Sequence, residues 1–257
     1  MPQLQVQCLD SMGGDIDVVN AARASFGRDS SYDEQGNLRP ADASLIRFLA
    51  DGLSSRELGD LLAEIVACGD PTEALALFKR IRNISTHEAP FAQVELKFRV
   101  SAPLAIARQL WKSHVGVVGG DAGYAAWSEE SGRYIAEARE CYEPDVWRKR
   151  PADIKQGSSG AIDDPHAARV ISFESGSAAG AAFDHLRELG VAPEQARFVL
   201  PQSMMTTWVW KGSLLFFARV CRLRQDGHAQ AEAQEIANMI AEHCARVAPV
   251  SWAALRG

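Results

Sequence analysis

The sequence lacks several features that would define a class of protein at once. Its five cysteines are scattered and form no Cys-x-x-Cys pair, so neither a zinc site nor a disulfide framework is expected. The first residues contain no basic segment followed by an apolar run, and no apolar stretch reaches membrane-spanning length. We therefore expect a cytoplasmic protein without a signal peptide, membrane span or metal site. The net charge of −6, with both signs spread along the chain, argues against a general nucleic-acid binder.

The order of apolar and polar residues predicts one α+β domain, because strands and helices follow each other without a βαβ rhythm. Strands are expected at residues 3–9, 94–100 and 206–210, and loops at 115–124 and 150–165. The predicted helices share a 3.6-residue apolar period or a capping residue at their start. They cover residues 18–26, 43–53, 56–68, 71–81, 104–114, 177–188, a segment opened by Pro193, 214–223 and 230–246.

The most specific residue pattern lies in the middle of the chain. Thr86-His-Glu-Ala-Pro-Phe91 precedes a predicted strand, and the helix after that strand ends in Lys112-Ser113-His114. A loop then leads to Ser128-Glu-Glu-Ser-Gly-Arg-Tyr134. In an extended stretch, Ser131 and Arg133 point to one face and can offer a hydroxyl and a guanidinium to a phosphate. The alternative is a solvated loop.

Two further segments in the C-terminal half carry arginines in a recognisable setting. Arg197 lies in Ala196-Arg-Phe-Val-Leu-Pro201, and Arg224 is followed by Asp226-Gly-His228-Ala-Gln-Ala-Glu232. Taken alone, Arg197 is typical of a surface residue whose stem covers apolar neighbours. Arg224 alone is typical of a cation at a helix C-terminus, and His228 of a cap or a structural hydrogen-bonding residue.

Together, these segments resemble the flavin-dependent thymidylate synthases. That family has Arg-His-Arg, a short spacer and Asn-Glu-x-Ser-x-Arg-Tyr, and it also has Ala-Arg-x-Val-Leu-Pro and Leu-Arg before His-Ala-Gln-x-Glu. The resemblance implies a thymidylate synthase-like fold over residues 1–257, with a mixed sheet flanked by helices. The chain differs from the family pattern by a predicted helical insertion around 54–82 and a loop insertion around 115–127.

The resemblance also implies chemistry. The expected cofactor is FAD, with NADPH and methylene-tetrahydrofolate as co-substrates, and the expected nucleotide is UMP or dUMP. Ordinary thymidylate synthases use a cysteine that follows a proline, and no Pro-Cys dipeptide occurs here. Arg224 and Arg197 are the expected catalytic residues, because they can stabilise negative charge that develops on the pyrimidine oxygens. The residues expected to bind the nucleotide are Gln109, Ser131, Arg133, Arg197 and Arg224.

The family positions along the flavin are only partly kept. Ala89 and Ala92 replace a threonine and a glutamate, and Lys112 keeps a charge without the bidentate fork of arginine. His114 can be neutral at pH 7, so up to one positive charge is lost there. Trp127, in the lengthened loop, can stack on a ring system or anchor the loop. The residues expected to bind the cofactor are His87, Lys112, Ser113, His114, Ser128, Glu129 and His228.

These departures suggest a divergent branch, similar to the uridylate C5-methylases of nucleoside-antibiotic (polyoxin) pathways. The predicted reaction is the flavin-dependent addition of a reduced methylene from methylene-tetrahydrofolate to C5 of UMP, dUMP or both. Two alternatives stay open. One is a standard thymidylate synthase that uses dUMP alone, and the other is a non-catalytic homologue that binds a nucleotide or flavin. Since the family forms tetramers, we expect a homotetramer with shared active sites.

Overall fold

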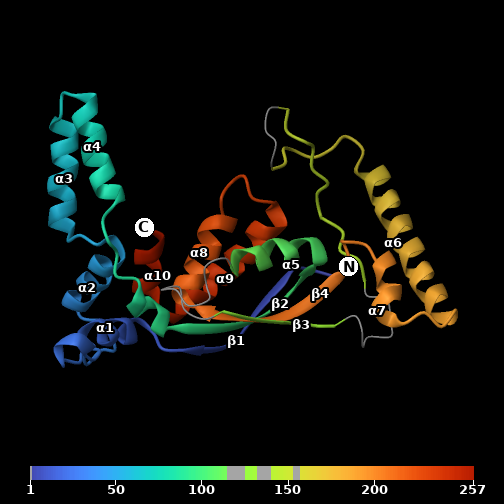
Figure 1. Cartoon of the computed structure of the whole chain (residues 1–257), viewed down its shortest axis with the longest axis horizontal. Helices are drawn as coiled ribbons and strands as arrows, with labels where there is room; N and C mark the ends of the chain where they lie inside the picture. Colours follow the sequence, from blue (N-terminus) through green and yellow to red (C-terminus); the bar gives the residue numbers. More distant parts are fainter. Residues whose placement is uncertain (1, 115–124, 132–139, 153–156) are drawn as a thin grey trace.

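The centre of the molecule is a four-stranded sheet in the order β1-β2-β4-β3 (Figure 1). The computed structural model describes residues 2–114, 125–131, 140–152 and 157–257. The strands are β1 (Gln5–Met12), β2 (Glu95–Pro103), β3 (Ala126–Glu129) and β4 (Met205–Ser213). The α+β class is confirmed. The sheet was expected to be mixed, but all three pairings in the described residues are antiparallel. In the central pair, the last residue of β2, Pro103, lies opposite the first residue of β4, Met205.

One face of the sheet forms the core. Alternate residues of β2 and β4, such as Phe98 and Trp210, are fully buried beneath α5 (Leu104–Trp111), α8 (Leu214–Arg224) and α9 (Ala231–Val247). Burying a side chain of this size stabilises the fold by about 1.5–3 kcal/mol. Gly212 allows the ring of Phe216 to lie directly on β4, since a Cβ atom there would collide with that ring. The sheet and these helices therefore form one packed core, from which the segments between them extend.

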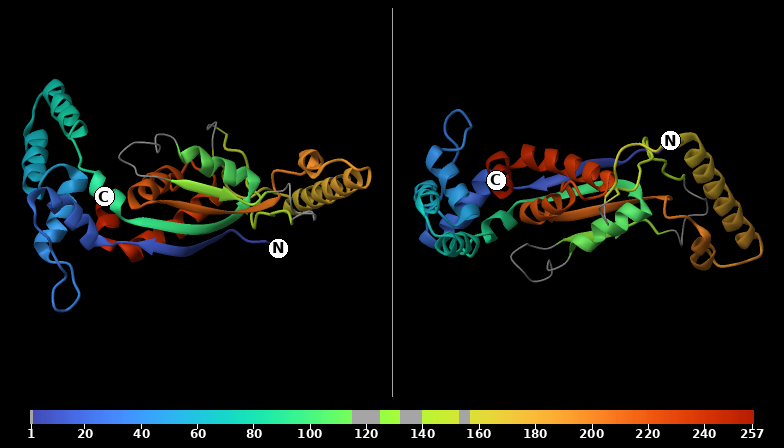
Figure 2. Two further views of the ribbon diagram at one scale, coloured as in Figure 1. Left: turned by 60° about the horizontal axis from the view of Figure 1, so that its bottom comes forward. Right: turned by 90° about the horizontal axis from the view of Figure 1, so that it is seen from above.

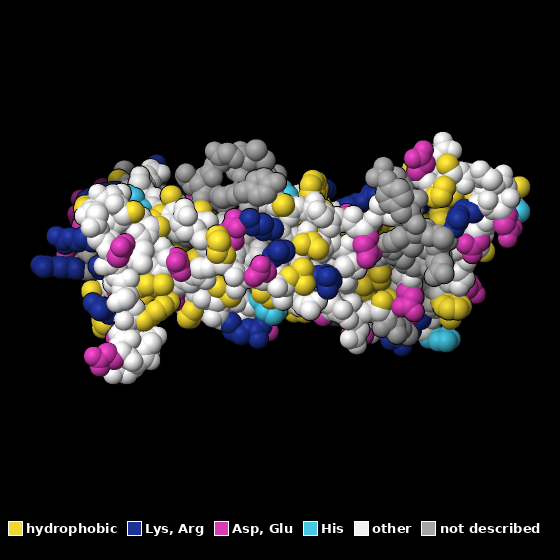
Figure 3. Space-filling model, turned by 90° about the horizontal axis from the view of Figure 1, so that it is seen from below, with side chains coloured by type: hydrophobic (Ala, Val, Ile, Leu, Met, Phe, Trp, Pro, Cys, Tyr) yellow, Lys and Arg dark blue, Asp and Glu magenta, His cyan; other side chains and the backbone are white. Residues whose placement is uncertain are grey.

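The opposite face of the sheet carries polar side chains. Lys97 forms an ion pair with Asp10 at 3.8 Å, and Lys211 forms one with Glu95 at 2.6 Å. Figure 3 shows this side of the molecule, where charged and apolar groups are mixed. An antiparallel sheet commonly buries one face and leaves the other in water.

The first two helices and the last helix of the chain meet at one end of the sheet. There, α1 (Asp15–Arg23) and α2 (Pro40–Asp51) pack against α10 (Pro249–Arg256). The buried carboxylate of Asp15 accepts hydrogen bonds from the backbone N–H groups of Val250 and Ser251, at 3.0 and 2.8 Å. These bonds satisfy N–H groups that have no partner within α10 itself. Sequence analysis predicted the first two helices and missed α10.

Two pairs of helices extend from opposite ends of the sheet (Figures 1 and 2). The first pair is α3 (Ser55–Ala67) and α4 (Pro71–Arg82), which confirms the predicted helices; their status as an insertion remains a proposal. The second pair is α6 (Pro165–Glu188) and α7 (Pro193–Ala196). None of the described helices is both long and apolar enough to cross a membrane.

The structure corrects three element boundaries. Helix α6 begins at Pro165 rather than 177, because Asp164 caps it by accepting from Ala167 N–H at 2.9 Å. Helix α2 begins three residues before the predicted 43, with a proline in its first turn. Strand β3 begins at Ala126, within the last two residues of the range 115–127 that was expected to be a loop insertion; residues 115–124 of that range lie outside the described residues.

Candidate functional site

The side chain of Arg224 stands where three elements meet. It ends α8, and its Nη2 donates to the backbone carbonyl of Gln109 in α5. Its Nε and Nη2 also lie 3.4 and 3.3 Å from the hydroxyl of Ser113, in the 3-10 turn Lys112–His114 that follows α5. Partial burial lowers the pKa of Arg224. The guanidinium nevertheless stays charged at neutral pH, since arginine ordinarily titrates above about 12.

The Arg224 contacts leave part of the guanidinium for a ligand. Within the described part of the chain, Nη1 of Arg224 makes no hydrogen bond. A fixed, half-buried guanidinium of this kind can bind an oxyanion or a carbonyl oxygen on which negative charge develops. Gln109, another residue expected to bind the nucleotide, lies beside it.

A chain of polar contacts continues from Gln109 into α9. Its amide donates to the side-chain oxygen of Gln230 at 2.5 Å. Gln230 precedes α9 as its N-cap residue, and in the first turn of that helix the carboxylate of Glu232 accepts two hydrogen bonds from Nη2 of Arg148, at 2.6 and 2.8 Å. Burial alone would raise the pKa of Glu232, but these hydrogen bonds lower it. Sequence analysis did not single out Arg148, because its ion-pair partner Glu232 lies 84 residues away in the chain.

His114 belongs to a cluster of aromatic rings. Its Nε2 accepts a hydrogen bond from Trp210 Nε1 at 2.7 Å, and its ring centroid lies 4.6 Å from that of Trp111. Trp127 completes the cluster by stacking on Trp208 at 4.3 Å, with the planes 16° apart. Burial lowers the pKa of His114, because the charged imidazolium is poorly solvated there. Trp127 is thereby anchored in β3 against the sheet, and its stacking on a ligand ring stays a prediction.

The segment from 128 to 131 runs along the edge of the sheet. Glu129 accepts hydrogen bonds from Thr206 Oγ1 at 2.8 Å and from Trp127 Nε1 at 3.2 Å. Ser128 is exposed and Ser131 is half-buried. Arg133, predicted to bind the nucleotide, lies outside the described residues.

The chain does not bring the other predicted residues to Arg224. Arg197 is exposed near α7, and its Nε donates to the carbonyl of Glu194 at 3.2 Å. His87 is exposed and stacks on Phe48, with ring centroids 6.0 Å apart. Lys112 and His228 are also exposed. No contact between described residues joins Arg197 or His87 to the cluster around Arg224.

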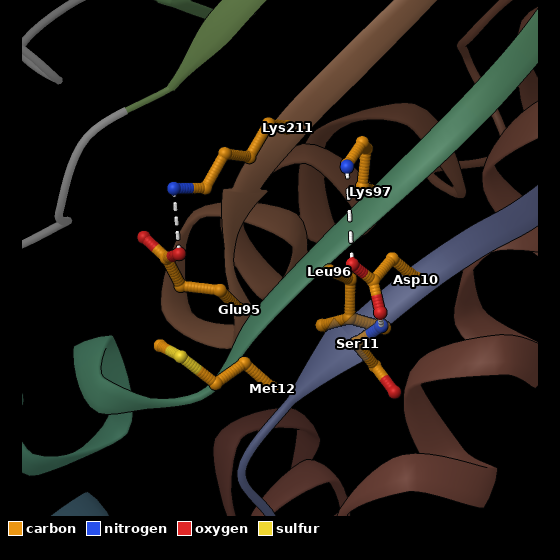
Figure 4. Close-up of a pocket in the computed structure, with 7 residues that line it drawn as sticks. All are labelled: Asp10, Ser11, Met12, Glu95, Leu96, Lys97 and Lys211. Atoms are coloured by element: carbon orange, nitrogen blue, oxygen red, sulfur yellow. Dashed lines mark hydrogen bonds and ion pairs between the residues drawn. The ribbon is translucent and has the colours of Figure 1, made fainter.

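A hollow of about 230 Å³ lies elsewhere, on the polar face of the sheet (Figure 4). Its walls include the two ion pairs Lys97–Asp10 and Lys211–Glu95, with Met12 at one side. The charges in this hollow are therefore already paired with one another. It contains none of the residues that sequence analysis singled out, so we place the candidate site at Arg224.

Comparison with known proteins decides the family. The family described as thymidylate synthase complementing protein matches residues 7–250. The flavin-dependent thymidylate synthase of Thermus thermophilus is 32% identical over 249 residues, which cover 97% of this chain and 74% of that protein. The chain belongs to the flavin-dependent thymidylate synthase family. The expectation of an enzyme of this family is thereby confirmed.

A second relative and a solved structure agree with this family assignment. The flavin-dependent thymidylate synthase of Treponema pallidum is 32% identical over 253 residues, covering 96% of this chain and 67% of that protein. Among solved structures, the UMP/dUMP methylase PolB from Streptomyces cacaoi bound with 5-Br dUMP has a TM-score of 0.72. It is 23% identical, and the match covers 98% of this chain and 94% of that one. At that identity, the likeness to PolB shows the fold.

The residues expected to bind FAD in a family member fit such a ligand in part. Five of the seven are exposed, and four of these, His87, Lys112, Ser128 and His228, can contact a ligand without giving up a side-chain hydrogen bond to a described residue. The other three are already engaged: Ser113 with Arg224, His114 with Trp210, and Glu129 with Thr206 and Trp127. Ser113 and Glu129 can keep these contacts while accepting another, since a hydroxyl or carboxylate oxygen has more than one lone pair. Leu215 stands at the place of the family's flavin arginine and is buried, so that arginine is not kept.

Proposed function

We propose that this protein is a flavin-dependent methylase that adds a reduced methylene from methylene-tetrahydrofolate to C5 of UMP or dUMP. The single observation that carries the proposal is the fixed, half-buried guanidinium of Arg224 beside Gln109, in a chain that belongs to this family. The bound ligands in the two PolB structures are 5-Br dUMP and 5-Br UMP, which supports a uridylate substrate with either sugar.

The protein's part in the reaction is to place the nucleotide and stabilise charge. Making C5 nucleophilic places negative charge on the pyrimidine oxygens, and a charged group fixed beforehand stabilises that charge more than mobile water does. Arg224 fits this role, and Gln109 fits that of an orienting hydrogen-bonding residue. FAD, when bound, would supply the redox chemistry, with NADPH as the reductant.

The two buried cysteines are poor candidates for a protein nucleophile. Cys221 and Cys244 are buried, and burial raises the pKa of Cys221 to about 12 and that of Cys244 well above its usual value. A protonated thiol is a weak nucleophile, because the thiolate is the reactive form. This agrees with a reaction that needs no attack by cysteine at C6.

The position of Arg197 supports a shared site. The arm that carries it, α6 and α7, exposes large apolar side chains, among them Phe198 at 78% and Phe173 at 73%. Exposed apolar surface of this kind marks contact with another protein. We infer a homotetramer in which the arm of one chain brings Arg197 to the Arg224 cluster of another.

Mixing two inactive variants tests the shared site. Arg197→Ala and Arg224→Ala chains, unfolded and refolded together, should form mixed assemblies in which some sites contain both arginines, so activity should reappear. Each variant refolded alone is the control. If the mixed protein stays inactive although it assembles, both arginines act within one chain.

The substrate is tested directly by incubation with methylene-tetrahydrofolate, a reductant and either UMP or dUMP. We expect the mass of both nucleotides to increase by the added methyl group. A preference for dUMP of more than about a thousandfold would instead indicate a site that excludes the 2′-hydroxyl, as in a standard thymidylate synthase. If the protein binds a nucleotide but methylates neither UMP nor dUMP, and if NADPH does not bleach the yellow colour of its flavin, the protein is the non-catalytic homologue. An enzyme that methylates both the ribonucleotide and the deoxyribonucleotide would suit nucleotide or nucleoside-antibiotic biosynthesis.

A further inference from the structure

Arg148, which lies outside the family motifs, forms an ion pair with Glu232 at 2.6 Å. The Glu232 side chain is 6% exposed and that of Arg148 is 24% exposed. Nε of Arg148 also donates to the hydroxyl of Ser158 at 2.8 Å, so this arginine joins two parts of the segment between residues 140 and 164. Breaking a buried ion pair by removing one partner is costly, because it leaves an uncompensated charge.

The charge of Glu232 fixes the direction of the hydrogen bonds that follow. Gln230 and Glu232 lie at the start of the same helix, and an ionised carboxylate only accepts hydrogen bonds, so the amide oxygen of Gln230 is favoured on the side away from Glu232. This oxygen points to Gln109 and accepts from the amide there, as the structure shows. The amide of Gln109 is thereby held in one of its two orientations. Arg224 donates to the backbone of this same residue.

We propose that Arg148 is a positioning residue for the nucleotide site, acting through Glu232 and Gln230 to fix the orientation of the Gln109 amide. The inference rests on the proposed function, in which Gln109 contacts the nucleotide. Without Arg148, the side chains of Glu232 and Gln230 lose their fixed arrangement, and the amide of Gln109 can rotate. Nucleotide binding then weakens although no group that contacts the nucleotide has been removed.

The test measures dUMP binding by calorimetry and the steady-state constants of four proteins: wild type, Arg148→Met, Gln230→Ala and the double variant. For Arg148→Met, we expect the Kd and KM for dUMP to rise about tenfold, the effect of one hydrogen bond to a charged group, while kcat changes little. In the Gln230→Ala background, the same substitution should have less than about a twofold effect, because the path is already cut.

Two further variants separate positioning from general stability. Lys149→Met removes the neighbouring lysine, whose ion pair with Asp163 lies on the same segment, and should bind dUMP as the wild type does. Glu232→Gln removes the charge of the carboxylate and keeps the shape of the side chain, so it serves as the second variant if Arg148→Met fails to fold. It should weaken dUMP binding to the same degree.

The outcomes distinguish the inference from the function on which it rests. If the wild type binds dUMP and Arg148→Met binds it equally well, the inference is overturned alone. The same holds if Arg148→Met weakens binding just as much in the Gln230→Ala background, since the effect then bypasses Gln230. A wild-type protein that binds neither dUMP nor UMP overturns the proposed function, and this inference with it.

Discussion

Replacing Arg224 by alanine should nearly abolish methylation and only moderately destabilise the fold. The structure gives Arg224 two hydrogen-bond acceptors within the chain, the carbonyl of Gln109 and the hydroxyl of Ser113. Because the guanidinium is only half-buried, we expect their loss to cost about 1–2 kcal/mol of folding stability. For a chain of this length, that lowers the melting temperature by roughly 2–8 °C. Removing the charge from the transition state should cost about 2–4 kcal/mol, or roughly 30- to 900-fold in kcat/KM.

Arg222 is the matched control for Arg224. It lies on the same helix, carries the same charge and donates to the carbonyl of Leu255 at 2.9 Å. Arg222→Ala should therefore lower the melting temperature by a similar amount and leave kcat/KM unchanged. The assay is methylation of dUMP measured well below the melting temperature of both variants. Normal kcat/KM in Arg224→Ala, or an equal loss in Arg222→Ala, would refute this reasoning.

Four further outcomes are expected. Arg197→Ala should leave the melting temperature unchanged, because its described contact is a single exposed hydrogen bond, and should abolish turnover; normal turnover would remove Arg197 from the site. The folded-state pKa of His114 is lowered, so the unfolded chain binds the proton more readily and stability should fall as pH drops below about 6.5. His114→Gln should reduce that pH dependence, which thermal melts at pH 5 and 7 would show; a residual slope is expected from His243, whose pKa is lowered by burial and Arg246. FAD should raise the melting temperature, though weakly given the altered flavin positions, and no shift at saturating FAD would contradict cofactor binding. Single Cys→Ser variants should keep full methylation, and loss of activity in one that remains folded would argue for a cysteine nucleophile.

The elements that sequence analysis predicted are those with local signals. Helix α3 begins after Ser54, whose backbone N–H donates to Glu57 at 2.8 Å while its hydroxyl accepts from Glu57 N–H at 3.3 Å, as the capping-box pattern predicts. Strand β2 follows from alternation of buried and exposed residues. The start of α6 was equally local, in the pair Asp164-Pro165, and was interpreted as part of a loop.

Other features depend on contacts between distant residues. Strand β3 has four residues and obtains its hydrogen bonds from the edge of β4, so little in its own sequence marks it. The approach of Gln109 to Arg224 was suggested by family resemblance, whereas the ion pair of Arg148 with Glu232 had no signal in either segment. The separation of Arg197 from Arg224 follows from the direction in which α6 leaves the sheet, which residue patterns do not encode.

The aromatic cluster around His114 also makes the protein its own optical probe. Four of the six tryptophans, Trp111, Trp127, Trp208 and Trp210, lie in it, with neighbouring ring centroids from 4.3 to 6.5 Å apart. At such separations, excitation energy passes readily between indoles, so the emission of the whole chain is weighted toward this one place. His114 contacts these rings and directly follows Ser113, which holds Arg224. A ligand that moves the turn Lys112–His114 would therefore change the intrinsic fluorescence. Its binding can then be followed without an attached dye.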